Sequence, residues 1–215
     1  AREAQKMAYF ILGKATRADF VTVSAFTYDA PEVHDSVCKA AQRGADVKVI
    51  LDKDYAETRR NTQACCMQLL EAGARLFFAQ GCKIQGEYSA IGKKVRDARG
   101  IQHSKTVRVG KWWLTGSCNW STSSRCNLEL DTLTELFSER TAREHEKLLF
   151  QNAVRQERED IRACIAELQA KELEKQEKAA AKAAERRSAS AGRTVSDVLR
   201  DATLADAYVN SRGGV

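Results

Sequence analysis

The sequence predicts an α/β fold: a mixed, mostly parallel sheet flanked by helices, with a long C-terminal helical extension. Short runs of β-branched and apolar residues alternate with segments that repeat apolar residues every three to four positions. The C-terminal part then loses these apolar runs and consists largely of strong helix formers and charges. Strands joined through helices imply right-handed crossovers and a sheet covered by helices.

The elements of the first half alternate regularly. In chain order we expect helix 2–15, strand 19–26, helix 31–44, strand 46–52, helix 57–72 and strand 74–80. Pro31 opens the second helix at a position that tolerates proline, and Gly44 closes it. This order implies right-handed crossovers between the strands of a largely parallel or mixed sheet.

Residues 81–100 interrupt this alternation and lead directly to His103. The segment is rich in glycine and in basic residues, and it shows no sustained period. One interpretation is a basic insertion loop that binds a polyanionic substrate through Lys93, Lys94 and Arg96. The other, equally open, is a solvated insertion.

His103 and Lys105 open the stretch with the most chemistry. The β-branched residues that follow predict a strand, so the two side chains are expected on one face of it. After a turn at Gly110 and a second strand comes Gly116-Ser117-x-Asn119. A neutral imidazole is a competent nucleophile near pH 7, since its ordinary pKa is about 6.5. An ammonium and an amide can bind the oxygens of a phosphate.

This pattern resembles the HKD motif of the phospholipase D superfamily. The segments 25–27, 41–52 and 69–78 also resemble its single-motif members, the small bacterial endonucleases and the mitochondrial cardiolipin hydrolase (Zucchini) group. The resemblance covers roughly residues 5 to 150. It implies a phospholipase D-like catalytic domain, assigned to residues 1–155, that hydrolyses phosphodiesters through a phosphohistidine without metal or cofactor. The substrate it implies is nucleic acid or an anionic phospholipid such as cardiolipin.

The resemblance also implies roles for single residues. His103 would be the nucleophile or acid, Lys105 and Asn119 the phosphate ligands, Ser117 a supporting hydrogen bonder and Glu129 the residue that orients the imidazole. The family reaction needs two histidines, and this chain carries one motif. A two-fold homodimer through the His103 face is therefore expected.

Two further histidines and three tryptophans have simpler interpretations. His34 and His145 are interpreted as surface histidines, and Trp120 is expected to pack below the site. Trp112 and Trp113 should face opposite sides of a strand, with base stacking a less favoured role for either.

One position departs from the family pattern. The family has an Asp five residues after the Lys, where this chain has Gly110. This departure motivates a second hypothesis, a catalytically impaired phosphate-binding or scaffold module that recruits partners through the long helix.

Composition adds weak constraints. The net charge of +6 suits an anionic substrate. The seven cysteines form no C-x-x-C pair and no zinc-ligand spacing, which indicates a reducing compartment. No run approaches the roughly 18 apolar residues of a membrane span. The expected location is intracellular, in the cytoplasm or on the mitochondrial surface; because the chain begins with Ala, a removed N-terminal anchor or targeting peptide stays open.

From Ser138 onward a helical pattern is expected. Residues 156–187 form a charged helical extension that offers a surface for a protein partner. Residues 188–215 are a flexible tail, with either a short docking helix at 195–209 or weak order there.

Overall fold

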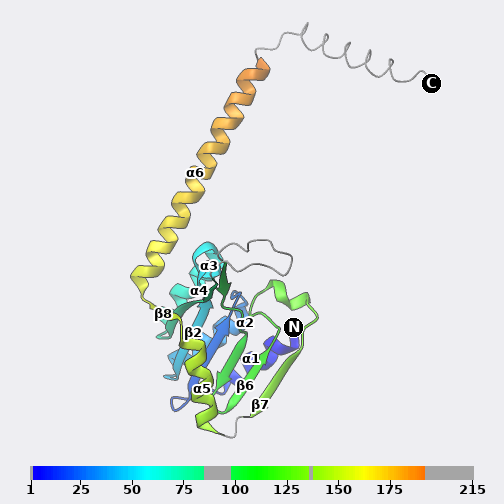
Figure 1. The fold of residues 1–215 in the computed structure, drawn as a ribbon, viewed down its shortest axis with the longest axis vertical. Helices are drawn as coiled ribbons and strands as arrows, with labels where there is room; N and C mark the ends of the chain where they lie inside the picture. Colours follow the sequence, from blue (N-terminus) through cyan, green and yellow to red (C-terminus); the bar gives the residue numbers. More distant parts are fainter. Residues whose placement is uncertain (1, 85–97, 136–137, 192–215) are drawn as a thin grey trace, which may run out of the picture. The chain divides into compact units, whose positions relative to one another are not determined.

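The computed structural model describes residues 2–84, 98–135 and 138–191, and its order of elements is shown in Figure 1. The basic side chains of Lys93, Lys94 and Arg96 lie outside the described residues. So does the tail beyond residue 191. The chain divides into two compact units, residues 1–168 and 169–215.

A mixed sheet of eight strands forms the centre of the first unit in the described part of the chain. Its strand order is β4-β3-β2-β1-β5-β6-β7, and β8 pairs with β3. The strands are β1 Phe20–Ala25, β2 Asp46–Asp52, β3 Arg75–Ile84, β4 Ala98–Ile101, β5 Thr106–Val109, β6 Trp112–Gly116, β7 Asp131–Glu135 and β8 Ala153–Gln156. The central strands β1, β2 and β3 are parallel, and the other pairings are antiparallel. The α/β fold with a mixed sheet is therefore as the sequence predicts.

Helices cover both faces of the sheet (Figure 1). The helices that contact the sheet are α1 Arg2–Gly13, α2 Pro31–Gln42, α3 Lys53–Thr58, α4 Arg60–Glu71 and α5 Glu139–Phe150. A 3₁₀ turn, η1, lies at Ser123–Cys126, and the last described helix is α6 Arg158–Ala191. Val21, Val23 and Ala25 of β1 are fully buried in the core that α1, α2 and α4 also line. Thr22 alternates to the other face, where α5 packs. The core therefore lies on one face of β1 and α5 on the other.

Two predicted helical segments are divided in the structure. The 57–72 segment becomes α3 and α4, because Arg59 has extended backbone (φ −118°, ψ 112°) and Asp52 caps α3 by accepting from Tyr55 N at 2.9 Å. The helical pattern from Ser138 is interrupted by β8, which the sequence did not predict. Residues 76–79 of β3 bind β8 antiparallel. The strand thus satisfies backbone groups at an otherwise open edge.

Of the helices that the structure describes, none combines the length and the hydropathy that a membrane span requires. Beyond residue 168, α6 is charged and almost entirely exposed as far as its side chains are described.

Candidate active site

His103 lies in an irregular segment between β4 and β5, at the carboxyl ends of β1 and β2. The strand predicted for His103 and Lys105 is wrong, because regular pairing with β1 begins only at Thr106, opposite Ser24. Side chains hold the backbone here instead: Ser104 N donates to Gln102 Oε1 at 2.7 Å, and the hydroxyls of Ser104 and Ser24 are 3.0 Å apart. Local side-chain hydrogen bonds of this kind compete with a strand ladder.

Asp52 attaches this segment to the sheet. Its carboxylate is buried at the end of β2, and one oxygen caps α3 while the other accepts from Gln102 N at 3.0 Å. A single buried carboxylate thus positions both a helix and the segment that carries His103. The sequence alone does not mark Asp52 as a residue of the site, since an Asp at the end of a strand is an ordinary cap signal.

The imidazole of His103 is exposed and packs against Phe26, with ring centroids 5.2 Å apart. Phe26 in turn contacts Tyr55, at 5.5 Å between ring centroids. Within residues 2–84, 98–135 and 138–191, neither ring nitrogen of His103 has a hydrogen-bond partner. The ring is therefore supported from one side by apolar contact and is accessible from the other.

Lys105 contacts the backbone that carries this imidazole. Its Nζ donates to the carbonyl oxygen of His103 at 2.6 Å and lies 5.7 Å from the Phe26 ring centroid. The residue is only 4% exposed. Burial lowers the pKa of Lys105, and the negative charge of Glu129 opposes that shift. The lysine is thus a buried cation, and a carboxylate from the second half of the motif is close enough to act on its charge.

Ser117 and Glu129 form the second half of the site. Ser117 Oγ donates to one carboxylate oxygen of Glu129 at 2.5 Å, and Asn127 Nδ2 donates to the other at 3.1 Å. The hydrogen bond from Ser117 is the main cause that lowers the pKa of Glu129. Among the described residues, no hydrogen bond joins Glu129 to His103. The orienting role of Glu129 therefore stays a prediction.

Gly116 allows the chain to turn into this arrangement. A Cβ at Gly116 would overlap Asp131 and the carbonyl oxygen of Leu130. Cys118 N donates to Asp131 Oδ1 at 3.1 Å, and Ser117 N donates to Leu130 O at 3.1 Å. Close approach of two backbones thus requires glycine at this position.

Asn119 presents an unpartnered polar atom. Its Oδ1 is buried, and the described part of the chain offers it no hydrogen-bond partner. Its backbone carbonyl accepts from Gln5 Nε2 at 3.1 Å. The next residue, Trp120, is fully buried as predicted and donates from Nε1 to Ser24 O at 3.1 Å. Ser24 thus contacts both halves of the motif, through its hydroxyl and through its carbonyl.

The other two histidines are not surface residues, so that interpretation is wrong. His34 is 7% exposed and lies between the Tyr28 hydroxyl and Gln68 Oε1, at 3.3 and 2.7 Å. His145 is half-buried and packs against Trp113, with ring centroids 4.0 Å apart and ring planes tilted by 49°. Burial lowers the pKa of both. Each imidazole therefore contacts residues that do not belong to the His103 site.

Metal ligands do not gather in the described residues, where no group of three or more His, Cys, Asp or Glu is arranged to hold an ion. The expectation of a metal-free and cofactor-free reaction stays a prediction.

Comparison with known proteins places the chain among related sequences and folds. The family model described as "Cardiolipin synthase, PLD-like domain" matches residues 11–152. The structure of NucT from Helicobacter pylori is similar with a TM-score of 0.57 at 17% identity, covering 71% of this chain and 91% of that one. Nuc from Salmonella typhimurium, a phospholipase D family member, is similar with a TM-score of 0.55 at 19% identity, covering 71% and 90%. None of the curated proteins matches. At these identities the two structures show a shared fold.

Proposed function

Because this chain belongs to the family described as cardiolipin synthase, PLD-like domain, within the phospholipase D superfamily, we propose that it hydrolyses phosphodiesters with His103 as the attacking group. One observation carries the proposal. The exposed imidazole of His103 and the buried ammonium of Lys105 share the Phe26 ring, and Glu129 acts on the charge of that ammonium. A nucleophile and a cation that lie against the same aromatic ring therefore support the proposal.

The reaction we propose has two steps. A ring nitrogen of His103 attacks phosphorus, a P–N bond forms, and the bond from phosphorus to the leaving oxygen breaks. A second imidazole gives its proton to that oxygen and then takes a proton from the attacking water. A bond forms from the water oxygen to phosphorus, the P–N bond breaks, and His103 is released. Lys105 and Asn119 bind the non-bridging oxygens, where negative charge grows in the transition state. Ser117 holds the Glu129 carboxylate beside them.

The second imidazole is proposed to come from a second copy of the chain. The sequence has three histidines, and His34 and His145 are held by contacts of their own within the fold. A two-fold dimer through the His103 face would place the same imidazole from each subunit in one site.

The chemistry of the site identifies the substrate as a phosphodiester and does not distinguish between classes of phosphodiester. Both nucleic acid and an anionic phospholipid such as cardiolipin present one, and the net charge of +6 suits either.

For the chain as a whole we propose a catalytic domain at residues 1–155, a helical extension at 156–187 that recruits a protein partner, and a tail at 188–215. The charged, exposed surface of α6 supports the partner role.

The alternative, a module that binds phosphate without turnover, is favoured by Gly110. The family's motif Asp is replaced there by a glycine in the turn between β5 and β6, with φ +51°.

A single assay separates the two functions. Purified protein should cleave bis(p-nitrophenyl) phosphate in EDTA, and His103→Ala should abolish cleavage while Lys14→Ala, an exposed control, should not. Absence of wild-type turnover together with retained phosphate binding would support the alternative. Single-stranded DNA, RNA and cardiolipin vesicles, tested in one preparation, identify the substrate.

A further inference from the structure

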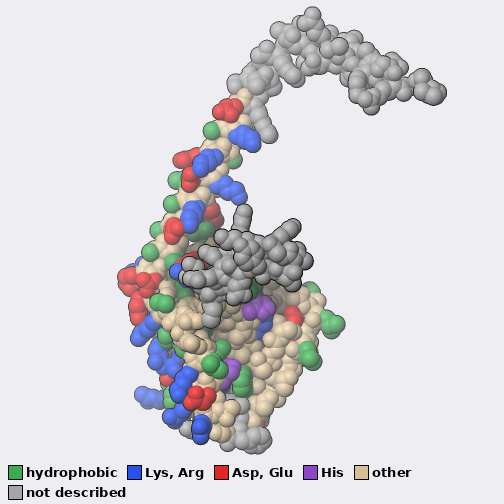
Figure 2. Space-filling model, in the orientation of Figure 1, with side chains coloured by type: hydrophobic (Ala, Val, Ile, Leu, Met, Phe, Trp, Pro, Cys, Tyr) green, Lys and Arg blue, Asp and Glu red, His purple; other side chains and the backbone are tan. Residues whose placement is uncertain are grey.

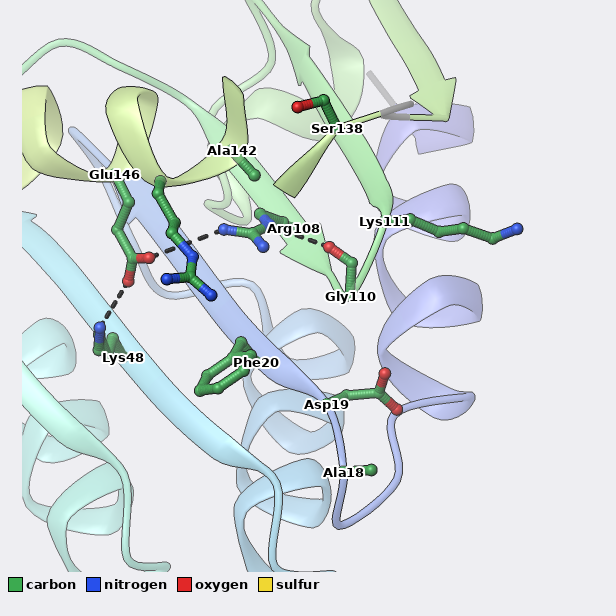
Figure 3. Close-up of a pocket in the computed structure, with 11 residues that line it drawn as sticks. Ala18, Asp19, Phe20, Lys48, Arg108, Gly110, Lys111, Ser138, Ala142 and Glu146 are labelled. Carbon is green, nitrogen blue, oxygen red and sulfur yellow. Dashed lines mark hydrogen bonds and ion pairs between the residues drawn. The ribbon is translucent and has the colours of Figure 1, made fainter. Parts of the chain in front are cut away.

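A cleft separate from the His103 site lies between α5 and the sheet, on the face of β1 opposite the core. Its volume is about 560 Å³. Figure 3 shows its walls: Phe20 at the start of β1, Lys48 on β2, Arg108 on β5, Gly110 in the following turn, and Glu146 on α5. Phe20 is at the first position of β1, whereas the active-site segment contacts Ser24 near the last. None of the residues that line the cleft is among those proposed to act in the His103 site.

The cleft carries an excess of positive charge. Lys48 Nζ is 2.6 Å from one oxygen of Glu146, and an Arg108 terminal nitrogen is 3.7 Å from the other (Figure 3). These side chains are only 23%, 14% and 19% exposed for Lys48, Arg108 and Glu146. Two largely buried cations therefore share one carboxylate, which leaves a positive charge in a place where solvent screens it weakly.

Other charged groups in the walls do not cancel this excess. Asp19 adds a second carboxylate to the walls, and it accepts from the backbone nitrogen and the hydroxyl of Thr16, both at 2.7 Å. Lys111 points away from the cleft in Figure 3 and pairs with Glu135. Arg143 on α5 is a third cation in the walls, so Lys48, Arg108 and Arg143 stand against the two carboxylates of Glu146 and Asp19. Figure 2 shows Lys and Arg side chains gathered around this helix.

Arg108 is oriented toward the cleft by the turn. Its Nε donates to Gly110 O at 2.9 Å, which fixes the plane of the guanidinium. Across the described ranges, its terminal nitrogens make no hydrogen bond, and their ion-pair partner is Glu146 at 3.7 Å. The terminal N–H groups of the Arg108 guanidinium can therefore donate hydrogen bonds to the oxygens of a phosphate.

An aromatic ring stands beside these cations. Phe20 is 56% exposed although it opens a central strand of the sheet. Exposed aromatic rings next to basic side chains are the means by which proteins stack the bases of nucleotides. An apolar ring left in solvent at the wall of a cationic cleft is therefore a second feature that points to the same kind of ligand.

We infer that this cleft binds a nucleotide phosphate, with Arg108, Lys48 and Arg143 on the phosphate and Phe20 stacked on the base. The ligand is either a free nucleotide or one nucleotide of a single strand, since both present the same phosphate and base. This site is separate from the proposed hydrolysis at His103 and does not rest on it.

The test uses the full chain carrying Lys105→Ala, which removes a proposed phosphate ligand at His103. Calorimetric titration at low salt with adenosine monophosphate should show one site. Phe20→Ala and Arg143→Ala should each weaken binding by about tenfold, the range measured for loss of one stacked base or one charged contact. Inorganic phosphate should bind more weakly than the nucleotide and should respond to Arg143→Ala but not to Phe20→Ala.

The matched controls are exposed residues outside the cleft. Phe10→Ala removes a ring that is 57% exposed on α1, and Arg140→Ala removes an exposed arginine of α5 outside the cleft; neither should change binding. A ten-residue oligothymidylate that binds more tightly than the mononucleotide, with the same dependence on Phe20, would identify a strand as the ligand. Equal binding of both would identify a free nucleotide. If nucleotide binding is absent, or does not change with Phe20→Ala and Arg143→Ala, the inference is wrong, whatever the turnover assay shows.

Discussion

The ammonium of Lys105 donates a 2.6 Å hydrogen bond to the backbone carbonyl of His103, the other residue of its own motif. The two side chains are therefore not parallel neighbours on a strand. The lysine turns back under the segment that carries the imidazole, and Phe26 contacts both groups. The buried cation and the exposed nucleophile thus lie against the same aromatic ring.

Lys105→Met should separate catalysis from stability. Methionine fills a similar volume without the cost of burying a charge, so the melting temperature should stay within a few degrees of the wild-type value. Loss of a cation that stabilises transition-state charge should lower kcat by about a hundredfold or more. Steady-state kinetics and thermal unfolding on the same preparation measure both. Lys14→Met is the matched control, and unchanged turnover in Lys105→Met would remove the lysine from the mechanism.

A shared site predicts how activity falls in mixed dimers. If each site needs His103 from both subunits, unfolding and refolding equal amounts of wild type and His103→Ala together should leave about one quarter of the wild-type specific activity, since only wild-type pairs are active. Independent subunits would retain one half. Sedimentation of the wild-type protein supplies the second measurement, and an active monomer would contradict the dimer.

Gly116→Ala should destabilise the protein by about 1–3 kcal/mol, because a methyl group there overlaps backbone of the neighbouring strand. Displacement of β7 would also move Glu129 from Ser117, so turnover should fall as well. Denaturant unfolding measures the first effect and the phosphodiester assay the second. Gly13→Ala is the control, because a Cβ at Gly13 meets nothing within 4 Å. Equal stability of the two variants would refute the steric argument.

Acid should weaken the fold through the buried histidines. Burial lowers the pKa of His34 and of His145 below the ordinary value of 6.5. Protons therefore bind the unfolded chain first as the pH falls, so stability is full above pH 6.5 and is lost as the pH drops below it toward the folded pKa values. The melting temperature should fall between pH 7.5 and pH 5.5.

The double variant His34→Gln, His145→Gln should show a smaller fall over the same interval, although it starts from a lower melting temperature. Thermal unfolding at several pH values measures the slope. A slope equal to that of the wild type would assign the acid sensitivity to other groups.

Much of the fold could be predicted from local sequence. Pro31 marks the start of α2, and the β-branched runs mark β1 and β2. The strand β8 could not be predicted, because its four residues continue a helical pattern and become a strand only through pairing with β3. The burial of His34 likewise cannot be predicted from its own helix, since it depends on Gln68 of α4 and on Tyr28 in the segment before α2.

By itself the sequence determined the order of strands and helices in the first half and the residues of the motif, His103, Lys105, Ser117, Asn119 and Glu129, because residue type, spacing and periodicity are local. Only the tertiary structure decided what surrounds them. Phe26, Asp52 and Ser24 reach the motif from the carboxyl ends of β1 and β2, across many residues of chain. Their contacts depend on how the strands align in the sheet, and that alignment is set by burial of the whole core rather than by any single segment.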